Sequence, residues 1–93
     1  MASEIPLKFS LAQNYPNPFN PTTVIDCQLP TEGMVTLKIY DILGREVAVL
    51  LNGRQHAGQY SVRFNAADLA SGVYFYRLQA GSFVQSRKPK LIK

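Results

Sequence analysis

Short runs of alternating apolar and polar residues constrain this chain more than any other feature of its sequence. Thr22–Leu29 places Ile25, Cys27 and Leu29 on one face, and Met34–Tyr40 repeats the pattern. A period of two is typical of a β-strand that is buried on one side. Turn-forming residues separate these runs, as they do in β-sandwiches and barrels. We therefore expect short antiparallel strands and no helix longer than one turn.

Five further strands and two tight turns are expected from the same signals. Asp41-Ile42-Leu43-Gly44 and Gln79-Ala80-Gly81-Ser82 predict hairpins, because aspartate and glycine favour such turns. Asn52-Gly53 is expected to end a strand, and Asn65–Ser71 to form one helical turn that places Leu69 in the core. The further strands are Leu7–Ala12, Arg45–Leu51, Tyr60–Phe64, Gly72–Gln79 and Phe83–Ile92.

The fold class follows from this strand count and from the length of the chain. About seven strands in 93 residues fit an all-β, antiparallel immunoglobulin-like β-sandwich. The unbroken apolar run in Gly72–Gln79 indicates a central strand covered on both faces. Tyr74 is open to two interpretations, a plain core residue or a corner tyrosine whose hydroxyl reaches the backbone. One domain is expected at residues 9–93, with residues 1–8 as a linker end or an expression start.

Reactive side chains are scarce, which argues against an enzyme. The single cysteine, Cys27, excludes an intrachain disulfide, and its place on an apolar strand face predicts a buried structural thiol. The single histidine, His56, is expected in solvent. No catalytic or cofactor-binding motif is present, and no metal site is expected. Calcium stays open, because Asn17, Asn20 and Asp26 offer oxygen atoms without a known calcium-binding spacing.

The positive charge is confined to the end of the chain. The net charge is +4, yet Met1–Ser86 holds six basic and six acidic residues. The excess in Arg87–Lys93 indicates a solvated end or a signal read by a receptor. We expect no nucleic-acid partner, because the aromatic residues beside Arg77 are expected to pack. No apolar run approaches the roughly 20 residues of a transmembrane helix. The absence of a secretory leader predicts a cytoplasmic protein or an excised piece of a longer secreted chain.

A proline-rich segment, Asn14–Pro21, precedes the regular strands. Its prolines lack N–H donors and favour extended geometry in the residues before them, so it is neither a helix nor a central strand. We expect a semi-rigid loop that Tyr15 and Phe19 anchor to the core.

Three segments together resemble one protein family. Asn14–Thr23, Ile39–Val47 and Leu69–Leu78, in this order, resemble the type A C-terminal sorting domain of the type IX secretion system of Bacteroidetes. The resemblance covers nearly the whole chain, from about Phe9 to Lys93. The positions that it marks as structural motif residues are Pro16, Asn17, Pro18, Phe19, Asp41, Gly44, Gly72 and Tyr74.

The resemblance implies a non-catalytic targeting module with an immunoglobulin-like fold. Members of this family follow a covalently linked N-terminal cargo, which a signal peptide takes to the periplasm. An outer-membrane translocon then recognises the domain, and a sortase-like protease commonly removes it and attaches the cargo to surface lipopolysaccharide. The resemblance therefore implies a secreted or cell-surface protein whose partners are the translocon and this protease. We expect the domain itself to be a monomer.

The C-terminal segment holds the candidates for the sorting signal. Phe83–Ile92 is expected to offer an edge strand to a partner, with lysine side chains steering association and Pro89 preventing indiscriminate pairing. An ordinary last strand is the alternative. We expect deletion of residues 90–93 to abolish export and to leave the sandwich folded. The candidates are Lys88, Lys90, Leu91, Ile92 and Lys93.

Two other functions stay open. A carbohydrate- or surface-binding accessory module of a secreted glycoside hydrolase would need an exposed aromatic platform, most plausibly Tyr60, Phe75 or Phe83. A structural or assembly spacer of immunoglobulin type would show self-association instead.

Overall fold

The computed structural model describes residues 6–92 and shows an all-β chain within that range. No helix among these residues is long and apolar enough to cross a membrane. The nine strands are β1 (Ser10–Leu11), β2 (Thr22–Leu29), β3 (Gly33–Tyr40), β4 (Glu46–Gln55), β5 (Gly58–Asn65), β6 (Gly72–Val73), β7 (Phe75–Ala80), β8 (Phe83–Arg87) and β9 (Lys90–Leu91).

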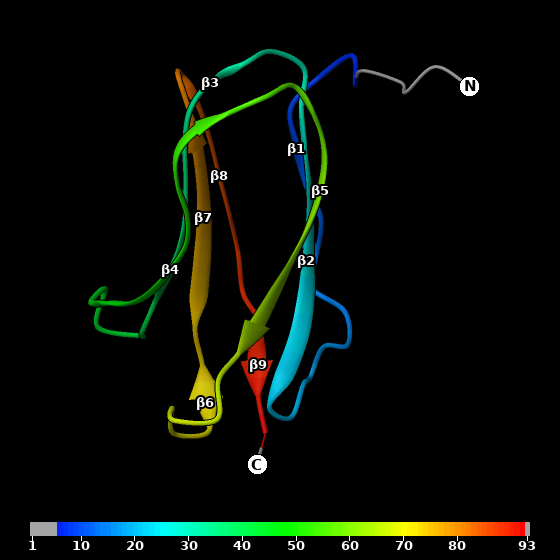
Figure 1. The fold of residues 1–93 in the computed structure, drawn as a ribbon. Coiled ribbons are helices and arrows are strands. Elements are labelled where there is room, and N and C mark those ends of the chain that lie inside the picture. Colours follow the sequence, from blue (N-terminus) through cyan, green and yellow to red (C-terminus); the bar gives the residue numbers. More distant parts are fainter. Residues whose placement is uncertain (1–5, 93) are drawn as a thin grey trace.

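The strands form two antiparallel sheets and one small ladder. The first sheet has the order β1-β2-β5, the second has the order β4-β3-β7-β8, and β6 pairs with β9. The two sheets lie face to face, and the small ladder lies at the end of the molecule where the C-terminus emerges (Figure 1). This arrangement confirms the antiparallel immunoglobulin-like sandwich expected from the sequence. Residues 6–92 contain nine strands where about seven were expected, because two of the expected strands are each divided in two.

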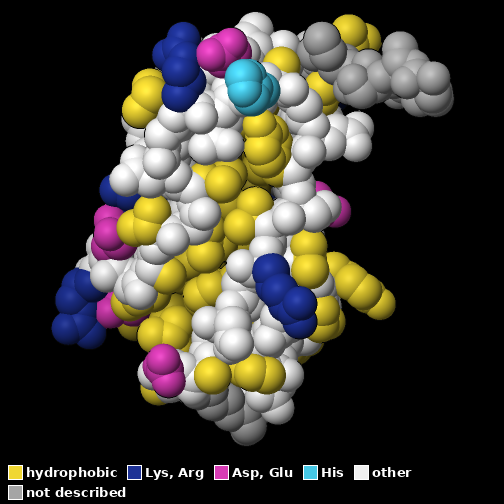
Figure 2. Space-filling view, in the orientation of Figure 1, with side chains coloured by type: hydrophobic (Ala, Val, Ile, Leu, Met, Phe, Trp, Pro, Cys, Tyr) yellow, Lys and Arg dark blue, Asp and Glu magenta, His cyan; other side chains and the backbone are white. Residues whose placement is uncertain are grey.

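One apolar core joins both sheets, because the alternating strands turn one face inward. Its fully buried members include Ile25 and Leu29 of β2 and Leu37 and Ile39 of β3. Partly buried side chains of β4 and β5 pack against this core. Figure 2 shows apolar side chains gathered in a band down the middle of the visible face, with most charged groups toward its margins. The alternation read from the sequence therefore identified the inward face of β2 and β3.

Both expected hairpins are present. Gly44 has φ +84° and Gly81 has φ +60°, a region that favours glycine because other residues meet steric strain there. The loop between β7 and β8 has two residues, Gly81 and Ser82, since Ala80 pairs with Phe83. Of these two loop residues only Gly81 has a positive φ, which matches a type II′ turn.

Strand boundaries differ from the expectation in the first half of the chain. The first strand is confined to Ser10–Leu11, shorter than the expected Leu7–Ala12. The return strand β4 does not end at Asn52-Gly53 but continues to Gln55. It continues because β3 supplies a full ladder of partners, including Thr36 opposite Asn52. Pairing with a neighbour therefore overrides the local turn signal.

The expected strand Gly72–Gln79 is divided in two. β6 ends at Val73 and β7 begins at Phe75, with Tyr74 between them. β7 is central in its sheet, as predicted, but only one of its faces is covered: Tyr76 and Leu78 are buried, whereas Arg77 is exposed. The apolar run in Gly72–Gln79 therefore did not indicate burial on both faces, because Phe75 lies on the outer face of the sheet and is only half-buried.

Residues 65–71 contain a turn in place of the expected helical turn. The Leu69 N–H donates to the Ala66 carbonyl, and the Asn65 side chain accepts from the Ala67 N–H. Leu69 is half-buried against the core, and Ala66 is the fully buried residue of this segment. The expected last strand is also divided, because β8 ends at Arg87 and β9 begins at Lys90.

Candidate functional site

The C-terminal segment with the candidate signal residues is held on both sides by backbone hydrogen bonds. β9 pairs with β6 in an antiparallel ladder. On its other side, the Phe19 N–H donates to the Lys90 carbonyl, and the Ile92 N–H donates to the Phe19 carbonyl, both at 2.9 Å. β9 therefore lies between β6 and the proline-rich loop and is not the open edge expected from the sequence. The edge strands of the second sheet are β4 and β8.

The candidate signal residues divide between the surface and the core. Lys88, Lys90 and Ile92 are exposed, whereas Leu91 is only 1% exposed and belongs to the core. Lys93 lies outside the described residues. The segment thus presents two lysines and one isoleucine outward while its leucine fixes it to the sandwich. Deletion of residues 90–93 would remove this core leucine, so the structure argues against the expectation that the deleted sandwich stays fully folded.

The proline-rich loop is fixed to the domain by one of its two expected anchors. Phe19 is 2% exposed and packs against Phe64 with ring centroids 5.9 Å apart. Tyr15, by contrast, is 81% exposed, so the expectation that it packs into the core was wrong. The Asn17 side chain accepts a hydrogen bond from the Lys90 N–H at 2.9 Å. The loop therefore contacts the terminal strand directly through motif residues.

The peptide bonds that precede Pro16, Pro18 and Pro21 are all cis. In this conformation the loop turns back on itself, and its backbone pairs with β2 where Tyr15 and Val24 exchange hydrogen bonds of 3.0 Å.

A buried polar network, which the sequence reasoning did not find, holds the start of this loop. The Tyr76 hydroxyl accepts from the Asn14 N–H and donates to the Ala12 carbonyl, both at 2.7 Å. The Asn14 amide donates to the Thr23 hydroxyl at 3.0 Å and to the Pro16 carbonyl at 3.1 Å. Burial raises the pKa of Tyr76 to about 12, since the phenolate would lose its hydration. The only feature of the sequence that pointed to this network was Tyr76, a residue with a polar hydroxyl at an inward position of a strand.

The Asp41 side chain organises the hairpin between β3 and β4. Its carboxylate accepts from the backbone N–H groups of Leu43 and Arg45, both at 2.9 Å, and pairs with the Arg45 guanidinium at 2.7 Å. The hydrogen bond from the Arg45 backbone, above all, holds the pKa of Asp41 below its usual range. The turn presents two exposed apolar side chains, Ile42 and Leu43.

Tyr74 combines the two roles that were open for it. The side chain is buried, and its hydroxyl donates to the carbonyl of Ala70, four residues upstream. The Tyr74 N–H also donates to the Pro89 carbonyl at 3.1 Å, next to β9. Gly72 precedes it with φ +153° and pairs with Leu91. These motif residues therefore support the C-terminal strand from the side opposite the proline-rich loop.

The residues considered for chemistry do not come together. Cys27 is buried, and this burial, with a smaller contribution from the Asp26 charge, raises its pKa to about 11. His56 is exposed in the loop between β4 and β5. Of the oxygen atoms considered for calcium, one from Asn17 accepts from the Lys90 backbone and one from Asp26 accepts from the Ser61 hydroxyl. Within residues 6–92, no group of three metal-binding side chains occurs.

The three aromatic residues considered for a carbohydrate platform lie in different places. Tyr60 packs against the core, and its hydroxyl donates to the His56 carbonyl. Phe83 stacks on Phe9, with ring centroids 5.0 Å apart. Phe75 lines a shallow pocket on the outer face of the second sheet. They therefore form no shared platform.

Comparison with known proteins identifies the family of the chain. No match to a curated protein was found. The model of the family described as "Secretion system C-terminal sorting domain" matches residues 13–93, which span all three motif segments, the polar network around Asn14 and the C-terminal strand. This match confirms the resemblance seen in the sequence, and the chain therefore belongs to the family of type IX secretion system C-terminal sorting domains.

Proposed function

We propose that this domain is a non-catalytic sorting signal that directs a covalently linked N-terminal cargo through the type IX secretion system. The observation that carries the proposal is the family match over residues 13–93. Its partners would be the outer-membrane translocon and a sortase-like protease, and the cargo would reach the cell surface or the medium from the periplasm.

The geometry of the C-terminus suggests how such a signal would be read. Two lysines, Lys88 and Lys90, project from a segment whose backbone is fixed by β6 and by the proline-rich loop. Neither lysine forms an ion pair with any carboxylate of the described residues. Fixed charges on a rigid support steer association and reduce the entropy lost on binding. We infer that the translocon reads this fixed, positively charged surface of the folded domain.

Export of a reporter tests the proposal. Residues 5–93 are fused to the C-terminus of a periplasmic reporter and expressed in a bacterium that has a type IX system. The reporter should appear outside the cell, and in a strain that lacks the translocon it should stay in the periplasm. Retention of the fusion in the competent strain would refute the sorting function.

Charge substitutions separate the signal from the fold. The double variant Lys88→Gln/Lys90→Gln removes two exposed charges without touching the core, so the domain should stay folded and export should fall. The matched control is Lys8→Gln/Arg63→Gln, which removes two exposed charges elsewhere and should export normally. Equal export of both double variants would show that Lys88 and Lys90 are not read.

A further inference from the structure

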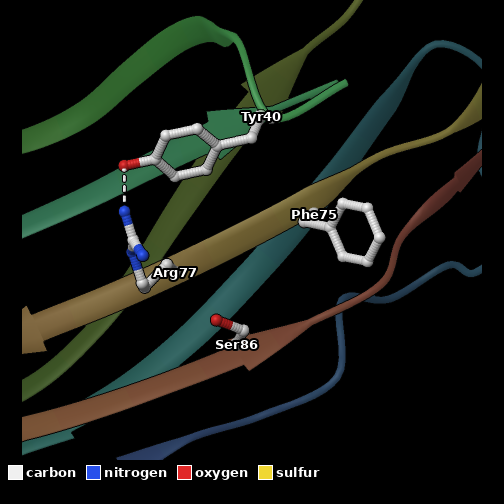
Figure 3. Close-up of a pocket in the computed structure, with 5 residues that line it drawn as sticks. Tyr40, Phe75, Arg77 and Ser86 are labelled. Atoms are coloured by element: carbon white, nitrogen blue, oxygen red, sulfur yellow. Dashed lines mark hydrogen bonds between the residues drawn. The ribbon is translucent and has the colours of Figure 1, made fainter. Parts of the chain in front are cut away.

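The outer face of the second sheet carries a pocket that the sorting function does not use. Tyr40 of β3 lies opposite Phe75 of β7, and Arg77 of β7 lies opposite Ser86 of β8. Alternate residues of a strand share a face, so these four side chains project on the side away from the core (Figure 3). With Gly44 they line a cavity of about 250 Å³ that is open to solvent.

Among the described residues, Arg77 is the only charged side chain that lines this pocket. Its guanidinium donates to the Tyr40 hydroxyl at 2.8 Å and lies 4.8 Å from the centre of the Tyr40 ring. No carboxylate of residues 6–92 forms an ion pair with it, and the nearby acids Asp41 and Glu46 are paired with Arg45 and Lys38. Four of its five N–H donors therefore have no protein acceptor within residues 6–92.

The fixed guanidinium selects the charge of a ligand. Stacking on Tyr40 restricts its orientation, and a planar guanidinium held in this way binds a carboxylate through two parallel hydrogen bonds. No acidic side chain of residues 6–92 lines the pocket, and the Arg77 charge repels a second cation.

The remaining walls select the body of the ligand. The two aromatic rings of Tyr40 and Phe75 offer apolar surface, and the hydroxyls of Tyr40 and Ser86 offer hydrogen bonds. The pocket is smaller than the roughly 300–1,000 Å³ of sites that enclose drug-sized ligands, so it accommodates one small unit. It lies on the face of the sheet, where the backbone groups of the central strands β3 and β7 are already paired, so a ligand would bind here through contacts with side chains.

We propose that this pocket binds a single carboxylated sugar ring, a hexuronate residue. The carboxylate pairs with Arg77, the apolar face of the ring lies against the aromatic side chains, and the ring hydroxyls reach Ser86 and Tyr40. Neither Lys88 nor Lys90 lines the pocket, so the proposal stands whether or not the domain acts as a sorting signal.

Binding of three small probes tests both parts of the proposal. Methyl glucuronide, methyl glucoside and acetate are titrated into the ¹⁵N-labelled 93-residue chain, and amide shifts are followed by NMR. Methyl glucuronide should shift the amides of Tyr40, Gly44, Phe75 and Ser86. Methyl glucoside lacks the carboxylate and acetate lacks the ring, so each should bind about tenfold more weakly or worse.

Two arginine variants link the binding to the proposed contact. Arg77→Gln should weaken methyl glucuronide binding about tenfold or more, because the charged hydrogen bonds are lost. Arg63→Gln removes an exposed arginine from β5, in the other sheet, and should bind the glucuronide as the unmodified chain does. The dispersion of the amide spectrum shows whether each variant is folded.

Four results would overturn the proposal. Equal binding of methyl glucoside would show that the carboxylate is not recognised, and equal binding of acetate would show that the ring is not. Unchanged binding by folded Arg77→Gln would exclude the guanidinium contact. Absence of shifts around the pocket at millimolar methyl glucuronide would exclude the site altogether.

Discussion

Single polar residues decide how the proline-rich loop is held. The Tyr76 hydroxyl accepts from the Asn14 N–H and donates to the Ala12 carbonyl, and both Tyr76 and Asn14 are buried. A buried donor or acceptor without a partner loses its hydration without compensation. The stability of this region therefore depends on one oxygen atom in the opposite sheet.

Tyr76→Phe should lower the free energy of unfolding by about 1–3 kcal/mol, because two backbone groups lose their partner. Urea denaturation followed by circular dichroism measures this change. The matched control is Tyr60→Phe, which removes an exposed hydroxyl bound to the His56 carbonyl and should change stability by about 0.5 kcal/mol or less. Equal losses in the two variants would contradict a special role for the Tyr76 network.

Alkaline pH should weaken the fold through the same residue. Burial raises the pKa of Tyr76 from the ordinary value of 10.0 to about 12 in the folded chain. The contribution of Tyr76 to the free energy of unfolding is complete below pH 10. It is lost as the pH rises toward 12, because only the unfolded chain then releases the hydroxyl proton of Tyr76. The slope is at most about 1.4 kcal/mol per pH unit. Urea denaturation at pH 8 and pH 11 should therefore show a smaller alkaline loss for Tyr76→Phe than for the unmodified chain, and equal losses would contradict the shift.

At the scale of elements, the short strand β9 is stable because its neighbours hold it. Two residues make too short a ladder to persist alone, yet β6 pairs with one edge and Phe19 with the other. Leu91 adds a side chain buried in the core. The candidate signal segment is thus an integral part of the domain.

Leu91→Ala should destabilise the domain by about 2–5 kcal/mol, the usual cost of a cavity left by a core leucine. Ile92→Ala, next to it, removes a side chain that is 47% exposed and should cost less than about 1 kcal/mol. Thermal or urea unfolding compares the two variants. A Leu91→Ala domain as stable as Ile92→Ala would show that β9 is not docked as described.

The hairpin between β3 and β4 depends on a backbone conformation. Gly44 has φ +84°, where a residue with a Cβ atom costs about 1–2 kcal/mol. Gly44→Ala should therefore destabilise the domain by this amount in urea unfolding. Gly33→Ala is the control, since Gly33 has no positive φ and a Cβ atom there would meet nothing within 4 Å. Matching stabilities of the two variants would contradict a strained turn.

At the scale of the whole molecule, both sheets share one core, so they should unfold together. Cys27 of the first sheet is buried, and the pKa of its thiol is raised to about 11, so it should react with a thiol reagent only after unfolding. Its labelling in urea at equilibrium should follow the loss of β-sheet circular dichroism with one midpoint. Labelling at clearly lower urea concentration would show that the first sheet opens separately.

The sequence by itself determined the strand faces, the two hairpins and the family. Alternation identifies the inward residues Ile25, Leu37 and Phe64 because the side chains of a strand point to opposite faces. The hairpins follow from Asp41, Gly44 and Gly81 because turn geometry is a local property of a few residues. The three motif segments identify the family from the sequence, and this identification does not require the tertiary contacts to be known.

Only the tertiary structure decided where strands end and which residues meet. β4 passes through Asn52-Gly53 because β3 lies beside it, and Phe83–Ile92 divides at Pro89 because its end pairs with another ladder. The Tyr76 network and the pocket of Tyr40 and Arg77 join residues distant in the chain. Such contacts depend on how the sheets pack, and local periodicity carries no information about that packing.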